Sequence, residues 1–295
     1  MTTAPLDFEA ARAARRARHG KVVEWMYRHP TVALGSALLG IMVLMAIFAP
    51  YLGTVDPKAI APIKRLRFPD ANFWFGTDAL GRDVYSRVIY GSRVSLIVGL
   101  SVAALATGFG LAIGLVTGFS RITDAIVMRV MDGLMSIPPV LLAIALMSLT
   151  RASMGNVIFA ITISQVPQVT RLVRGVVLSL REQPFVEAAT AAGTGFFKTL
   201  WRHILPNTVA PVLVQGTYIC ASAMITEAIL SFIGAGTPPD IPSWGNIMAE
   251  GRSLFEIKYY IVLFPAMFLS ATVLAVNLVG DGLRDALDPR LARRM

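Results

Sequence analysis

The chain is organised around Phe185-Val186-Glu187-Ala188-Ala189-Thr190-Ala191-Ala192-Gly193, a polar stretch between apolar segments that continues to Leu205-Pro206-Asn207. Pro184 suits the first position of a helix and places Glu187 in or near the first turn, where the helix dipole favours a carboxylate. The alanines leave this helix almost without side-chain bulk, and Gly193 permits a break. A second short helix should carry an apolar stripe of Phe196, Phe197, Leu200 and Trp201. Such a pair suits a groove on another protein; an ordinary amphipathic connecting helix is the alternative.

Composition places the chain in a membrane. Of its 295 residues, 55% are hydrophobic and 15% are charged, and the mean hydropathy is +0.63. Soluble domains of this size are rarely so apolar, so we predict an all-α polytopic membrane protein in contact with lipid. Much of the net charge of +9 is explained by basic segments expected on the cytoplasmic side, so it does not require a nucleic-acid partner. The single cysteine, Cys220, lies in an apolar run and is expected to pack there.

Six apolar segments are long enough to suggest about six spans, at about 31–52, 94–119, 133–149, 156–170, 208–233 and 259–279. Gly110, Gly114 and Gly118 lie on one face of the second, which predicts close approach of a neighbouring helix. Pro138 and Pro139 should kink the third. The basic segment 1–30 is expected to be cytoplasmic, as an interfacial helix, although a disordered tail is an alternative for its first ten residues.

Two further features lie near or within the spans. Asp78, Arg82, Asp83 and Arg87 are spaced as a self-paired element, which we interpret as a salt-bridged turn in contact with water and as architecture rather than chemistry. Glu227 is the one acid well inside a predicted span, and charge at that depth is costly. Two interpretations of Glu227 are open: an acid that hydrogen-bonds neighbouring helices, or a carboxylate that faces a translocation path.

The central stretch resembles the cytoplasmic loop motif of ABC-importer permeases, in which the loop forms a coupling helix that docks onto an ATP-hydrolysing subunit. The matching residues are Glu187, Ala188, Ala189, Gly193, Leu205 and Pro206. His203 stands where that family usually has an aliphatic residue. Segments 75–96, 227–246 and 280–290 resemble the dipeptide, oligopeptide and nickel branch of these importers. The resemblance covers most of the chain, from about Trp25 to Arg290.

The resemblance implies one permease subunit of an ATP-driven importer of peptides, or of a related small solute such as a metal chelate. It implies four kinds of partner: a homologous second permease, two ATP-binding subunits, an extracytoplasmic substrate-binding protein and membrane lipid. It divides the chain into segment 1–30, a first span with an outer segment (31–93), a permease domain (94–282) with a coupling loop at 173–206, and a cytoplasmic tail (283–295). The chain is expected in the inner (plasma) membrane with both termini on the cytoplasmic side, because the coupling loop must lie on the side where ATP is hydrolysed.

The chain itself is not expected to be an enzyme or to hold a cofactor. The run from Gly193 to Thr199 resembles a phosphate-binding loop only superficially, since Phe197 stands where that loop needs glycine before Lys198. The three histidines are not paired at metal-ligand spacing, so we expect no metal site and no catalytic residue. The rival function is an ion-gradient-driven secondary transporter or channel, which would need a relay of ionisable groups within the membrane; Glu227 alone gives it little support.

Overall fold

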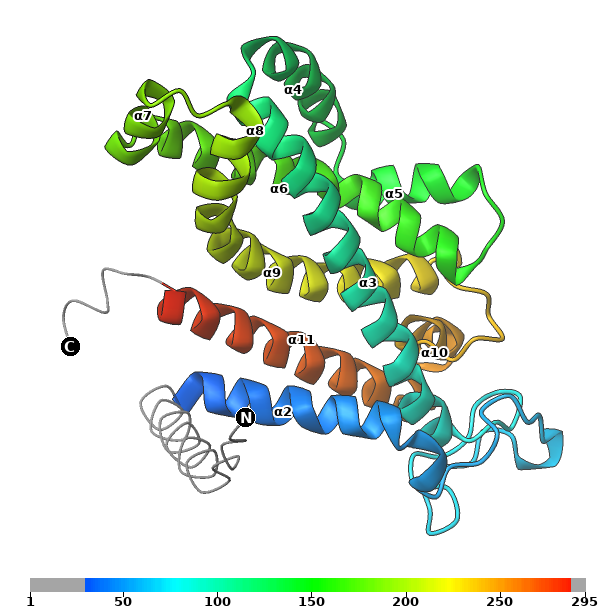
Figure 1. The fold of residues 1–295 in the computed structure, drawn as a ribbon. Helices are drawn as coiled ribbons and strands as arrows, with labels where there is room; N and C mark the ends of the chain where they lie inside the picture. Colours follow the sequence, from blue (N-terminus) through cyan, green and yellow to red (C-terminus); the bar gives the residue numbers. More distant parts are fainter. Residues whose placement is uncertain (1–29, 288–295) are drawn as a thin grey trace, which may run out of the picture.

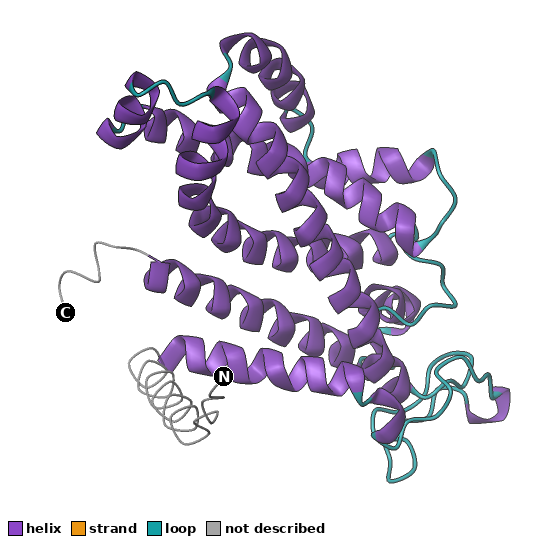
Figure 2. Cartoon of the chain, viewed as in Figure 1, coloured by secondary structure: helices purple, strands orange, loops and turns teal. Residues whose placement is uncertain are grey.

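The computed structural model describes residues 30–287, which form a helical protein with no strand among them (Figures 1 and 2). The helices are α2 (Pro30–Ile47), α3 (Val84–Phe119), α4 (Arg121–Met135), α5 (Pro139–Ser148), α6 (Met154–Arg181), α7 (Pro184–Ala191), α8 (Phe196–Thr199), α9 (Leu205–Phe232), α10 (Trp244–Gly251) and α11 (Tyr260–Leu287). A π-helical turn, Leu200–Ile204, joins α8 to α9. The predictions for residues 1–29 and 288–295 lie outside the described residues.

The prediction of an all-helical membrane fold is confirmed, although the number of spans stays a prediction. Within 30–287, four helical segments are long and apolar enough to cross a membrane: α2, α3, Phe196–Phe232 and α11. A fifth is added if α4 and α5 together form one span. The remaining long helix is α6, whose 28 residues include Gln165, Gln168, Arg171 and Arg174. The expectation of six spans therefore depends on α6, a long helix with a polar face.

Two expected spans differ in extent from the observed helices. The second was expected at 94–119, but α3 begins at Val84 because Asp83 caps it, its carboxylate accepting a hydrogen bond from the Ser86 amide at 2.8 Å. The third was expected as one kinked helix at 133–149. Instead α4 and α5 are separate helices that meet at 88°. Pro138 lacks an amide hydrogen and Pro139 starts α5, so the chain breaks between them instead of bending.

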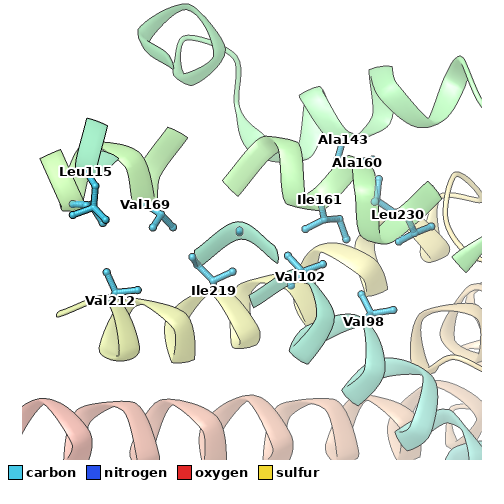
Figure 3. Close-up of a cluster of buried hydrophobic side chains, with 14 of the residues drawn as sticks. Val98, Val102, Leu115, Ala143, Ala160, Ile161, Val169, Val212, Ile219 and Leu230 are labelled. Carbon is cyan, nitrogen blue, oxygen red and sulfur yellow. The ribbon is translucent and has the colours of Figure 1, made fainter. Parts of the chain in front are cut away.

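The core lies where α3 packs between α6 and α9. Val102 of α3, Ile161 of α6 and Ile219 of α9 belong to one buried cluster (Figure 3). The expected glycine face of α3 is confirmed, since all three glycines are buried against α6. A Cβ atom added to Gly114 would lie 2.6 Å from the Cβ atom of Val173. Farther from this cluster, α11 runs between α9 and α2 (Figure 1).

The helices leave two different ends. At one end, called here the α10 end, the loop 48–83 lies with α10 and segment 234–259, and the Tyr260 hydroxyl donates to the carbonyl oxygens of Arg67 and Thr77 at 2.7 and 2.9 Å. The opposite end, called the α7 end, holds residues 118–124 and 181–204 (Figure 1). There the Arg181 side chain donates to the Gly118 carbonyl oxygen at 3.0 Å. The segments predicted to lie on one side of the membrane are therefore gathered at one end of the fold.

Candidate functional site

Helix α7 is short and is anchored by one side chain. Pro184 occupies its first turn, as predicted, and Glu187 lies in that turn with its side chain exposed. Val186 is buried and holds α7 to the rest of the α7 end. Ala188 is exposed and Ala189 is half-buried, so the outer surface of α7 is nearly flat. This surface can approach another protein closely, with Glu187 as its one charged group.

Gly193 ends α7 in the predicted manner. Its φ of +78° lies in the left-handed region, and no atom lies within 4 Å of the position that a Cβ atom would occupy. The requirement for glycine is therefore conformational rather than steric. The amides of Ala192, Gly193 and Thr194 donate back to carbonyl oxygens of α7, which closes the helix. This turn fixes where α8 starts relative to Glu187.

The predicted apolar stripe after the break divides into two pairs. Leu200 is buried, and the ring of Phe196 meets that of Phe119 edge-on, with centroids 4.6 Å apart. Phe197 and Trp201 point the other way, with exposed fractions of 81% and 73%. The short α8 and the π-helical turn are therefore held to the core on one side and present two large aromatic side chains on the other.

The last residues of the motif join this surface to α9. Leu205 and Pro206 form the start of α9, where Leu205 packs against the core cluster and Pro206 is exposed. The carbonyl oxygen of His203 accepts a hydrogen bond from the Asn207 side chain at 2.7 Å. Because Phe196–Phe232 is a nearly continuous helical segment, the exposed aromatic pair and the long α9 are parts of one rod.

A polar cavity of about 360 Å³ separates α7 from the ends of α3, α4 and α6. Its lining residues are Thr117, Gly118, Arg121, Asp124, Leu178, Arg181, Glu182 and Glu187. Asp124 is already paired, since the Arg174 guanidinium donates to its carboxylate at 2.7 Å. Within residues 30–287, Glu187 makes no ion pair. Its carboxylate is available to a group outside this chain.

Glu227 lies away from this surface, at the α10 end of α9, and is fully buried. The Ser231 hydroxyl donates to its Oε1 atom at 2.8 Å, and the Thr237 hydroxyl lies 3.5 Å from the same atom. The Asn246 side chain holds the adjoining loop by donating to the Thr237 hydroxyl at 3.0 Å. These contacts match the interpretation of Glu227 as a packing acid. Its assignment to a translocation path stays a prediction.

The expectation of a water-exposed turn at Asp78 is wrong. Asp78 and Arg87 are each 1% exposed, and the Arg87 guanidinium donates to Asp78 at 2.6 Å. Arg82 donates to Asp78 at 2.7 Å, and both arginines also contact Glu250 of α10. We call these four residues the buried ion network. The local spacing indicated the first three, but the partner is about 160 positions away, where no sequence pattern identifies it.

The described residues contain no group of three His, Cys, Asp or Glu side chains placed to hold a metal ion. The motif residues instead gather on a surface. Glu187, Ala188 and Gly193 lie on α7 and its end, and Leu205 and Pro206 lie at the base of α9. This arrangement offers a surface for contact with another protein.

A family model and individual relatives indicate the same family for this chain. The family described as "Binding-protein-dependent transport system inner membrane component" matches residues 106–293. A probable peptide ABC transporter permease of Sinorhizobium fredii is 54% identical over 98% of this chain and 99% of its own length. A putative peptide transport system permease of Brucella abortus is 44% identical over 90% of both chains. A dipeptide transport system permease of Alkalihalophilus pseudofirmus is 40% identical over 88% of this chain and 85% of its own.

Proposed function

The chain belongs to the family of binding-protein-dependent transport system inner membrane components, and we propose that it is a permease subunit of an ATP-driven importer of peptides. It is a multi-pass protein of the inner membrane. Three relatives at 40% identity or more, each aligned over most of its length, are named as peptide or dipeptide permeases, which supports peptides as the transported class. The observation that carries the proposal is α7, a slender helix at the end of a packed helical scaffold on which Glu187 is exposed and has no ion-pair partner among residues 30–287.

The exposed side chains of the α7 end support a protein partner there. A surface that presents Glu187 on α7 and two aromatic side chains on α8 and the π-helical turn suits a groove on a second protein. We assign that groove to an ATP-binding subunit, with ATP hydrolysed there and not on this chain. A second permease, a second ATP-binding subunit and an extracytoplasmic binding protein complete the proposed assembly.

The proposed mechanism couples a movement of α7 to a tilt of α9. Leu200 and Ile204 are both buried in the core cluster, so the π-helical turn cannot move without its neighbours. When the ATP-binding subunits close, α7 and α8 are displaced together and the displacement passes along the rod into the membrane. Packed interfaces of this kind switch between discrete arrangements, which suits alternation between inward-open and outward-open states.

The orientation is part of the proposal. Lys198 at the α7 end should be cytoplasmic, and Lys64 and Lys258 at the α10 end should be outside. Single cysteines at these positions, in a Cys220→Ser background, can be probed in intact spheroplasts with a thiol reagent that does not cross membranes. Positions 64 and 258 should be labelled and position 198 should not. Labelling of position 198 from outside would remove both the docking surface and the importer assignment.

The coupling role is tested by Glu187→Lys in the assembled complex. The reversed charge should leave the amount of inserted protein and its melting temperature unchanged, and should lower ATP hydrolysis stimulated by the binding protein. Glu256→Lys, an exposed acid at the α10 end, is the matched control. Unchanged uptake and ATP hydrolysis in Glu187→Lys would contradict the assignment. Peptide uptake by this chain alone, driven by an ion gradient, would favour a secondary transporter instead.

A further inference from the structure

Helix α6 has two exposed faces of opposite character. Gln168 and Arg171 are exposed on one face, near the middle of the helix. Phe159, Ile163 and Val166 lie on another face, where they line an apolar cavity with Phe109 of α3. Polar side chains at this depth are not placed against lipid. The first face must therefore meet water or protein, whereas the second is suited to lipid.

Helix α9 divides in the same way. Gln215, Tyr218 and Ser222 recur at helical spacing on one face, and Tyr218 lies at the middle of the helix. Leu213 lies on the other side and is exposed, lining an apolar cavity with Leu100 of α3. The polar faces of α6 and α9 are joined, because the Gln165 side chain donates to the Ser222 hydroxyl at 3.3 Å. Together they form one stripe, called here the polar stripe: Gln165, Gln168, Arg171, Gln215, Tyr218 and Ser222, of which Gln165 is buried where the two helices meet.

The polar stripe opens into a cavity toward the α7 end. This cavity of about 450 Å³ lies between α6, α9 and α11 and is lined in part by Gln215, Tyr218 and Arg284. Toward the α10 end the same face of α9 continues with Ile225 and Ile229, both about 40% exposed. The face is therefore polar at the middle of the two helices and apolar near the α10 end, and toward the α7 end the cavity combines Gln215, Tyr218 and Arg284 with apolar residues of α6 and α9 such as Leu172 and Val214.

Two polar side chains of this face are bonded to carboxylates within the chain. Arg171 donates to Asp132 of α4 at 2.5 Å, and the Tyr218 hydroxyl donates to Asp281 of α11 at the same distance. Gln168 and Gln215 add neutral amide side chains to the stripe, beside Arg284 in the cavity. Each amide offers both donors and an acceptor, which match the N–H and C=O groups of a peptide bond. A path needs such weak, repeated contacts, since tight binding would hold the solute.

We propose that the polar stripe is this subunit's side of the peptide translocation path, and that Ile225 and Ile229 close the path at the α10 end. The proposal rests on the function proposed above, and it identifies the face of the chain along which the peptide moves. The cavity beside Gln215 is the part of the path open toward the α7 end. Glu227 is not part of this face, because its carboxyl group is fully buried.

The test uses two matched pairs of single-cysteine variants in the assembled complex, in a Cys220→Ser background. Gln168→Cys is compared with Val166→Cys on α6, and Gln215→Cys with Leu213→Cys on α9. In each pair the two positions differ by two residues, so they lie at nearly the same depth on opposite faces. A negatively charged methanethiosulfonate reagent should label positions 168 and 215 at least about tenfold faster, because thiols ionise in water and not in an apolar environment. Equal rates, or faster labelling at positions 166 and 213, would overturn the face assignment.

The occupant is tested separately in proteoliposomes. Gln215→Leu should lower ATP-driven uptake of radiolabelled Ala-Ala several-fold while ATP hydrolysis stimulated by the binding protein is unchanged. Leu213→Ala, the control, should leave both uptake and ATP hydrolysis unchanged. Full uptake by a Gln168→Leu, Gln215→Leu double variant would overturn the stripe as the path. If the single-cysteine variants label as expected yet the wild-type complex imports no peptide, the face is hydrated but the peptide function is wrong. The proposal that the polar stripe is the translocation path and the proposal that the chain imports peptides are therefore contradicted by different results.

Discussion

At the α10 end, four charged side chains are bonded to one another in the buried ion network, whereas at the α7 end an acid and two aromatic side chains face outward. Asp78 and Arg87 are almost inaccessible and share Glu250 with Arg82. Glu187 has no ion-pair partner among the described residues, and Phe197 and Trp201 are largely exposed. The buried charges of the α10 end are satisfied within the chain, whereas Glu187, Phe197 and Trp201 are accessible to a partner.

The difference shows which end is preformed. Burying a charge is strongly unfavourable unless it is paired and hydrogen-bonded, so the buried ion network exists only when loop 48–83, α3 and α10 are all in place. The exposed side chains of the α7 end do not depend on pairing within the chain. Its exposed aromatic side chains cost little in the isolated chain and are covered when a partner binds. Substitutions should therefore act on folding at the α10 end and on assembly at the α7 end.

The largest effect is expected from Asp78→Asn. The substitution leaves the buried Arg87 and Arg82 without one of their two carboxylate partners, and breaking a buried pair typically costs about 3–5 kcal/mol. The melting temperature in detergent should fall sharply, with little folded protein recovered. A melting temperature equal to that of the wild type would show that Glu250 alone satisfies both arginines.

A smaller loss is expected from Gly114→Leu, between the two ends. The new Cβ atom would lie 2.6 Å from that of Val173, so α3 and α6 must separate, and overpacking of this kind costs about 1–3 kcal/mol. The matched control is Gly108→Leu on the same helix, where no atom lies within 4 Å of the added Cβ atom. Melting curves that coincide for the two variants would contradict close packing along this face.

The sequence predicted what depends on local spacing. The break at Gly193, the start of α7 at Pro184 and the glycine face of α3 are set by residues within a few positions of each other, and the structure has all three. The separation of α4 from α5 was expected only as a kink. Two consecutive prolines indicate an interruption, but they do not give the 88° angle, which depends on what α4 packs against.

The partners across the fold could not be predicted. Glu250 of α10 joins Arg87 of α3 from a distant part of the sequence, and the exposure of Phe197 against the burial of Leu200 depends on where the core lies. The polar stripe is a similar case. Glutamines at 165, 168 and 215 are visible in the sequence, but their common face appears only when α6 and α9 are placed side by side.

Trp201→Ala should leave folding nearly unchanged, since an exposed side chain away from the core typically contributes within about 0.5 kcal/mol. The comparison predicts that it acts on assembly instead. Recovery of the ATP-binding subunit with the purified permease should fall. Phe255→Ala, an exposed aromatic at the α10 end, is the control and should not change recovery. Normal recovery in Trp201→Ala would mean that this aromatic side chain is not covered by the partner.

The smallest effect is expected from Asp240→Asn, which removes an ion pair at the α10 end that is chemically like the buried ion network but exposed. Lys58 donates to Asp240 at 2.9 Å, and this hydrogen bond holds the pKa of the Asp240 carboxyl below its usual value. Because the folded-state pKa is lowered, the contribution is fully present above the unfolded pKa of about 3.9 and is lost as the pH falls through the folded value. Water and salt screen such a pair, so its loss should lower the melting temperature at pH 7 less than any substitution above. The small difference should disappear in about 1 M salt, where the Debye length is about 3 Å. A drop comparable to that of Asp78→Asn would mean that Lys58 and Asp240 hold loop 48–83 against segment 234–259 as firmly as the buried ion network does, and the contrast between buried and exposed charge at this end would fail.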